Sequence, residues 1–149
     1  MADTVLFELV TPERLLLSDQ VEMVVVPGTE GDFGVLPGHA PLLSTIRPGT
    51  IDVYEGRAVH QRIFISGGIA EVTPQRCTVL ADAAMPADAL DRATIEAELQ
   101  AAEAGLAGLR EQVERAAGIE RERVLADLAA AERAREVARA KLQVIAAAH

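Results

Sequence analysis

The sequence predicts an α+β fold in two domains, an antiparallel β-sandwich over residues 1–86 and an antiparallel α-helical hairpin over residues 87–149. The composition changes abruptly at Pro86, because all seven prolines lie at or before it and so do the aromatic residues. Alanine dominates the chain beyond it. Since alanine is the best helix former and proline and glycine are the worst, strands are expected to give way to helices at this boundary.

The first domain contains segments with the two-residue period of β-strands. The predicted faces are Val21, Met23 and Val25 in VEMVVV, and Ile51 and Val53 in TIDVY. Further strands are predicted at residues 5–10, 14–17, 59–65, 68–72 and 77–81.

Turn-forming dipeptides such as Pro27-Gly28, Pro37-Gly38 and Pro48-Gly49 separate these strands. Closely spaced strands with no helical pattern between them indicate an antiparallel sandwich, and a small barrel is the alternative. Several strands carry apolar residues on both faces, which fits a sheet that covers a core on one side and docks on the other.

The second domain shows two stripes of apolar residues at the three-and-four spacing of a helix. Asp88 is predicted to cap the first helix, and Ala117-Gly118 to end it. The first stripe is predicted at Leu90, Ala93, Ala97, Ala101, Ala104, Leu109, Val113 and Ala116. The second is predicted at Val124, Leu128, Ala131, Ala138, Leu142 and Ile145.

Two helices of about 28 residues would each reach roughly 40 Å. Gly105 and Gly108 weaken the first helix, so an earlier break there stays open. Alanine-lined helices approach closely but bury little area, at roughly 25 cal/mol per Å². The hairpin is therefore expected to be modestly stable and able to open along another surface.

The overall composition excludes several classes of protein. A net charge of −9 and a pI near 4.8 argue against binding to nucleic acid or to an anionic lipid surface. The single Cys77 excludes an intramolecular disulfide and suits a reducing compartment. We expect no signal peptide and no direct membrane insertion, because no basic-then-apolar start and no run of ~20 apolar residues occurs.

The search for catalytic or metal chemistry gives little. His39 lies in a Gly- and Pro-rich stretch. Three roles stay open for it: a general base, a structural hydrogen bond or an interface contact. Its neighbours match no hydrolase motif. His60 and His149 are scattered and Cys77 is alone, so no metal site is predicted. The glycines of the same stretch lack the Lys-Ser/Thr of a phosphate loop.

The alternating charges from residue 120 to 141 fit a solvated helix face. From Arg133 onward the balance is basic, which would also suit an acidic partner.

Three stretches in order, VPGTEGDFGVLPGHAPLLSTIRPG, ISGGIAEV and TVLADAA, closely resemble the epsilon subunit of the bacterial F-type ATP synthase. The tail ARAKLQVIAAA agrees with it. The resemblance spans nearly the whole chain and is strongest from residue 25 to 82. It implies a ten-stranded β-sandwich followed by a mobile helical hairpin.

The resemblance also implies the function, that of a non-catalytic rotor subunit of the central stalk. Such a subunit links the gamma subunit to the polar loops of the c-ring during proton-driven ATP synthesis. Its hairpin, when extended toward the catalytic beta and alpha subunits, suppresses ATP hydrolysis. The implied location is peripheral, on the cytoplasmic face of the bacterial inner membrane.

Residue roles carry over from the family by position. The implied c-ring contacts are Glu30, Gly31, Asp32 and Phe33. The implied gamma contacts are Thr11, His39 and Ser44. The implied inhibitory contacts are Arg133, Arg135, Arg139 and Lys141, facing an acidic segment of the beta subunit.

Some family members bind ATP through an Asp-x-x-Arg-Ala motif, and the corresponding stretch here is DALDRA. Asp88 lies four residues before Arg92 and Asp91 is adjacent to it, so the spacing departs by one residue. That shift turns one carboxylate by about 100° around a helix. We therefore predict no cofactor, with Asp88, Asp91 and Arg92 as the residues to test for ATP.

Two other functions fit the architecture less well. A chaperone or adaptor with a coiled-coil hairpin gives no reason for the GDFGVLPGHAPLL stretch. A carbohydrate-handling enzyme would need stacking aromatics and a carboxylate pair that the sequence does not offer.

Overall fold

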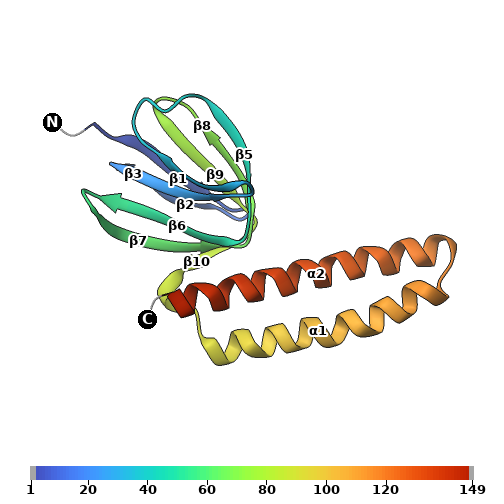
Figure 1. Cartoon of the computed structure of the whole chain (residues 1–149). Coiled ribbons are helices and arrows are strands. Elements are labelled where there is room, and N and C mark those ends of the chain that lie inside the picture. Colours follow the sequence, from blue (N-terminus) through green and yellow to red (C-terminus); the bar gives the residue numbers. More distant parts are fainter. Residues whose placement is uncertain (1–2, 148–149) are drawn as a thin grey trace. The chain divides into compact units, whose positions relative to one another are not determined.

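The computed structural model describes residues 3–147, and the chain divides into two compact units, residues 1–89 and 90–149 (Figure 1). The first unit holds ten strands and a short 3-10 helix, η1 (Ala87–Ala89). The strands are β1 (Val5–Val10), β2 (Leu15–Val21), β3 (Met23–Gly28), β4 (Gly31–Val35), β5 (Leu42–Ile46), β6 (Gly49–Glu55), β7 (Ala58–Ile65), β8 (Gly68–Val72), β9 (Arg76–Ala81) and β10 (Ala84–Pro86).

The strands form one continuous sheet in the order β10-β7-β6-β3-β5-β8-β9-β1-β2, with β4 paired to β3. Every pairing is antiparallel except that of β1 with β9. β3 and β5 are joined only by the pair Gly28–Ile46, so the sheet turns there into two layers (Figure 1). The predicted antiparallel sandwich is confirmed.

The two layers enclose one apolar core built by two-residue alternation. In β1 the side chains of Val5, Phe7 and Leu9 are buried while those between them are partly exposed. The prediction for β6 is confirmed, because Ile51 and Val53 are buried. The other core residues are Val21, Val24, Val26, Val35, Ile46, Ile63, Ile65, Ala70, Val72, Cys77, Val79 and Ala81.

The predicted face of VEMVVV is wrong for β3. The buried residues are Val24 and Val26, whereas Met23 and Val25 are only half-buried. Val21 is buried too, but it ends β2, and a bend at Glu22 separates the two strands. A period-two pattern that runs through a bend changes phase, and every side chain beyond it is assigned to the opposite face.

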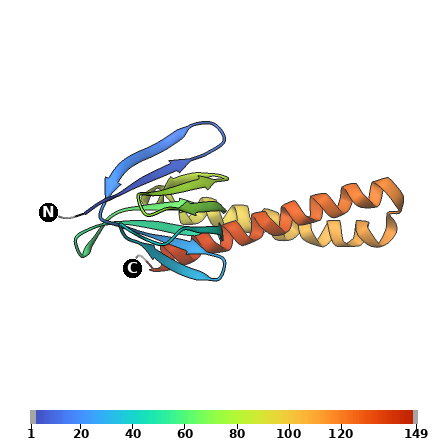
Figure 2. The ribbon, with the colours of Figure 1, turned by 90° about the horizontal axis from the view of Figure 1, so that it is seen from above.

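The second unit is a hairpin of two antiparallel helices, α1 (Arg92–Arg115) and α2 (Gly118–Ala147), which lie side by side in Figures 1 and 2. The helices have 24 and 30 residues and no break at Gly105 or Gly108, where an added Cβ would meet no atom within 4 Å. Gly118, with φ +62°, turns the chain between the helices.

The sequence analysis expected Asp88 to cap α1, and this prediction is wrong. The N-cap is Asp91, whose side chain accepts a hydrogen bond from the Thr94 amide at 3.0 Å. Pro86 is still paired with Ile63 in the sheet, and η1 intervenes before the helix begins. The first helical turn therefore starts one turn later than the proline suggests.

The contact between the helices follows a regular seven-residue pattern, called the seam below. Its residues are buried or half-buried and follow one another at alternating spacings of four and three, as in a coiled coil. In α1 they are Ile95, Leu99, Ala102, Leu106, Leu109 and Val113, continued by the C-cap residue Ala116; in α2 they are Val124, Leu128, Ala131, Arg135, Ala138, Leu142 and Ile145.

The predicted α2 stripe coincides with this seam, but the first half of the α1 stripe does not. Ala93, Ala97, Ala101 and Ala104 are exposed. In an alanine-rich helix several stripes satisfy the same periodicity, and the one with the larger side chains is buried because it removes more apolar area from water.

Gly68 offers a test of the sandwich. Its φ is +150°, and an added Cβ would lie 2.1 Å from the Leu80 carbonyl oxygen of the neighbouring strand. We expect Gly68→Ala to destabilise the sandwich by about 3 kcal/mol or more, measured by urea unfolding followed by circular dichroism. The control is Gly34→Ala, where the nearest atom would lie at 3.7 Å and φ is not positive. Equal stabilities for the two variants would contradict this account.

Candidate functional site

The β3–β4 hairpin carries the four residues predicted to face a membrane ring. Gly28 pairs with Gly31, which leaves Thr29 and Glu30 as the exposed turn. Gly31 has φ +135°, a conformation that favours glycine. At Gly28 a Cβ would lie 2.7 Å from the Gly31 carbonyl oxygen, so both glycines are needed for this tight turn.

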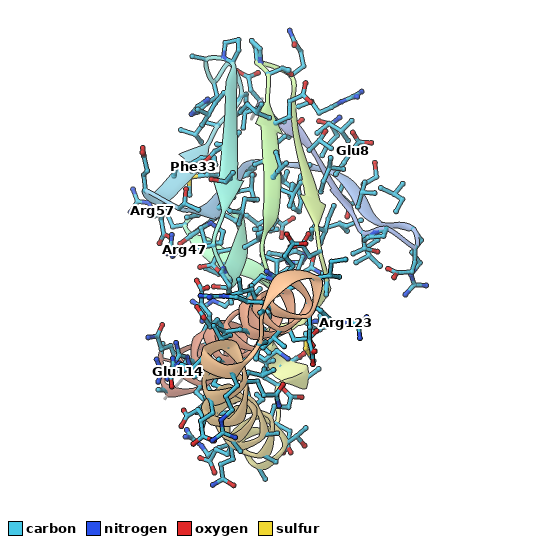
Figure 3. All side chains as sticks on the ribbon, turned by 90° about the vertical axis from the view of Figure 1, so that its right-hand side faces the viewer. Glu8, Phe33, Arg47, Arg57, Glu114 and Arg123 are labelled. Atoms are coloured by element: carbon cyan, nitrogen blue, oxygen red, sulfur yellow. The ribbon has the colours of Figure 1, made fainter. Side chains whose placement is uncertain are left out.

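Arg47 holds this hairpin from the neighbouring segment (Figure 3). Its guanidinium forms an ion pair with Asp32 at 2.5 Å and donates to the Gly28 carbonyl oxygen. The hydroxyls of Thr29 and Thr45 lie 2.8 Å apart and add a second link. A turn fixed in this way loses little entropy when it binds a partner.

The four predicted residues of this hairpin do not play the same part. Glu30, Gly31 and Asp32 are exposed at its tip. The Phe33 side chain is half-buried and packs against the sandwich core, so it supports the hairpin from inside (Figure 3).

Asp52 of β6 adds a second carboxylate to this region. Burial raises the pKa of Asp52, and the nearby charge of Asp32 raises it slightly further. Arg62, whose Nε lies 3.7 Å from Asp52 Oδ1, partly opposes this rise. Among residues 3–147, that oxygen finds no hydrogen-bond partner. The two carboxylates are therefore close enough to influence each other.

Thr11, His39 and Ser44 are not brought together. Thr11 is buried at the C-terminal end of β1 and donates to the Arg14 carbonyl oxygen at 3.4 Å. His39 lies toward the other end of the sandwich, since the neighbouring Gly38 amide bonds Pro74 in the β8–β9 turn. Ser44 of β5 pairs with the buried Ala70, three strands away from β1.

The sequence analysis expected a docking face without naming its residues; the structure offers one candidate, an apolar row across the outside of one layer. Ile69, Leu80, Val10 and Leu15 lie opposite one another on β8, β9, β1 and β2. The exposed fractions are 44% for Ile69, 53% for Leu80 and 54% for Leu15. The signal in the sequence was the run of consecutive apolar residues in each strand, Ile69-Ala70 and Val79-Leu80-Ala81, which leaves apolar side chains on both faces.

A polar row lies beside the apolar row on the same face. Glu71, Thr78 and Glu8 face one another across β8, β9 and β1. Arg76 pairs with Glu8 at 3.3 Å, and these side chains line a shallow hollow with Thr73. The face therefore combines exposed apolar side chains with two carboxylates.

The basic residues of α2 differ in their surroundings. Arg139 pairs with Glu103 at 3.8 Å and Lys141 with Glu98 at 3.4 Å, so both are held by α1. Arg133 is exposed and Arg135 is half-buried in the seam.

Two of the three ATP candidates, Asp91 and Arg92, are engaged by residues of α1. Asp91 accepts from the Thr94 amide and from the Thr94 hydroxyl at 2.6 Å, and these bonds lower its pKa. Arg92 pairs with Glu96 at 3.9 Å, and Asp88 lies exposed in η1.

No group of three or more potential metal ligands occurs among residues 3–147, and His149 lies outside the described residues. Cys77 is buried, which raises the pKa of its thiol to about 12 and leaves it unreactive. None of the helices in the described part of the chain has the length and apolar character that crossing a membrane requires.

Comparisons with known proteins agree on one family. The sequence model of the "ATP synthase, Delta/Epsilon chain, beta-sandwich domain" matches residues 4–87. The chain is 58% identical over 116 residues to the ATP synthase epsilon chain of Rhodospirillum rubrum, covering 78% of this chain and 87% of that one. It is 47% identical over 121 residues to the epsilon chain of Parvibaculum lavamentivorans, covering 81% and 92%.

A similar fold occurs in the mitochondrial ATP synthase of Euglena gracilis, in a structure of its OSCP/F1/c-ring. The TM-score is 0.71 at 23% identity, covering 98% of this chain and 82% of that chain. At this identity the likeness concerns the fold.

The cap of α1 provides a pH-dependent test. Because hydrogen bonds lower the folded-state pKa of Asp91, its contribution is complete above its usual value near 3.8 and is lost as pH falls through the folded value. Asp91→Ala should lower the melting temperature of the helices at pH 7 and have a smaller effect in strong acid, measured by circular dichroism. Asp88→Ala is the control and should have little effect; the opposite order would restore Asp88 as the cap.

Proposed function

This chain belongs to the ATP synthase delta/epsilon chain family, with the bacterial epsilon chains as relatives, and we propose how it works as a central-stalk subunit. It links the gamma subunit to the c-ring without catalysing a reaction, and it restrains ATP hydrolysis through its helical hairpin. The observation that carries the linking role is the exposed apolar row on the sandwich.

The gamma subunit is proposed to dock on this outer face. Burying Ile69, Leu80 and Leu15 would remove apolar area from water, at roughly 25 cal/mol per Å². Glu71 beside the row, which unlike Glu8 is in none of the ion pairs among residues 3–147, favours a partner that flanks its apolar surface with a basic side chain.

Two of the gamma contacts implied by the family, Thr11 and His39, lie toward opposite ends of the same layer. A strand of six residues spans roughly 20 Å, so a partner that reaches both must run along the strands. Ser44, on β5, would lie at the side of such a path.

The tip of the β3–β4 hairpin is proposed to contact the polar loops of the c-ring. Glu30, Gly31 and Asp32 are exposed there, and Arg47 holds the turn through the Asp32 side chain and the Gly28 carbonyl oxygen. Phe33 contributes by supporting the turn. A fixed tip transmits torque because it does not yield locally under load.

The helical hairpin is proposed to inhibit ATP hydrolysis, a role called the brake below. When it opens, Arg139 and Lys141 separate from Glu103 and Glu98. These two cations, with Arg133 and Arg135, then face the acidic segment of the catalytic beta subunit, and the neighbouring alpha subunit is a further contact. Because Asp91 and Arg92 are engaged at the helix start, the hairpin works without bound ATP. As a subunit of this complex, the protein would lie at the cytoplasmic face of the bacterial inner membrane, peripheral to it.

The docking face is tested by Leu80→Glu. Placing a charge in the centre of the apolar row should raise the Kd for purified gamma subunit by about tenfold or more, measured by calorimetry. Ile119→Glu is the control, because it adds the same charge to a residue that is 81% exposed in the helical unit. An unchanged Kd for Leu80→Glu would exclude this face as the gamma contact.

The brake is tested by removing residues 90–149 from the assembled complex. Coupled ATP synthesis should persist, while hydrolysis by the detached catalytic complex should rise about twofold or more if at least half of the complexes are restrained. Unchanged hydrolysis would remove the inhibitory role and leave the linking role in place.

A further inference from the structure

The seam of the helical hairpin contains one charged residue among its described positions, Arg135. Val124, Leu128 and Ala131 precede it in the seam of α2, and the residues that follow are apolar as well. A polar residue at a core position of a coiled coil lowers the stability of the paired helices and limits the pairings that they can form.

Arg135 has no carboxylate partner in the described part of the chain, unlike the cations that follow it. Arg139 and Lys141 each pair with a glutamate of α1, while Arg135 takes part in none of the ion pairs among residues 3–147. It is nevertheless half-buried. The side chain is thus partly removed from water without gaining a counter-charge, which opposes closure of the helices.

The ion pairs also fix which turn of α1 lies level with Arg135. Because the helices are antiparallel, the pair Arg139–Glu103 places Ala107 level with Arg135 and the pair Lys141–Glu98 places Ala104 there, so the level turn is residues 104–107. Within this turn, Leu106 is only 2% exposed. Arg135 therefore sits level with one of the two most buried side chains of the α1 seam.

We propose that Arg135 is a built-in weak point of the seam, which keeps the closed hairpin openable and gains an acidic partner only when the helices separate. The long aliphatic stem covers part of the seam while the charged end stays near water, so the closed form is tolerated. The weak-point role concerns the chain alone; the acidic partner rests on the proposed brake function.

The test is hydrogen exchange on the full-length chain, with the amides of the sandwich as an internal reference. Arg135→Leu completes the apolar seam and should slow exchange of the α1 and α2 amides by about tenfold. The matched control is Arg123→Leu, which removes the same charge from an exposed position on the same helix (Figure 3). It should change exchange by less than about twofold.

The inference is overturned if Arg135→Leu leaves exchange unchanged, speeds it, or acts no more strongly than Arg123→Leu. A separate measurement of hydrolysis in the assembled complex addresses the brake. If Arg135→Leu slows exchange but hydrolysis does not rise, the weak point stands and the brake fails. If exchange is unchanged while removal of residues 90–149 raises hydrolysis, the brake stands and the weak point fails.

Discussion

The organisation of the sandwich depends on the strict alternation of side chains in β8 and β9. Because Val79 and Ala70 must point inward to complete the core, their neighbours Leu80 and Ile69 must point outward. A sequence that is apolar on both faces of a strand therefore cannot hide its second face within its own layer. The same constraint that closes the core creates the exposed apolar row, and it gives that row a rigid backing.

The helical unit differs from the sandwich, because its two helices bury little apolar area against each other. Its seam is continuous but contains several alanines, so the packed area per turn is small. Among residues 3–147, two ion pairs join α2 to α1: Arg139–Glu103 lies at the surface, and in Lys141–Glu98 the lysine side chain is 18% exposed. Exposed ion pairs contribute about 0–1 kcal/mol each. The hairpin is thus held by many weak contacts, which suits an element that changes partners.

The sequence was sufficient for the two-part architecture because composition and periodicity act over many residues at once. It was less reliable where one residue decides the outcome. The bend at Glu22 reverses the phase of β3, and the pairing of Pro86 with Ile63 delays the helix start to Asp91. Both depend on contacts between distant segments, which periodicity along the chain does not contain.

The proposed docking residues show the same limit more sharply. The family motif predicted the tip of the β3–β4 hairpin, because its glycines are needed for a turn that is local in sequence. The apolar row, in contrast, takes one residue from each of four strands, so no contiguous motif records it. Only the pairing register of the sheet assembles it.

The energetics of the hairpin place its control in the seam. To move a two-state element from 1:99 to 99:1 requires about 5.5 kcal/mol of differential contact energy. Surface pairs contribute too little to set that balance, because each is worth only about 0–1 kcal/mol. Seam contacts have no replacement once the helices part, unless a partner offers an apolar surface. If the hairpin opens as proposed, the balance between its two forms is set by what occupies the seam, and a single charged residue there is expected to have more effect on it than any cation on the outer surface.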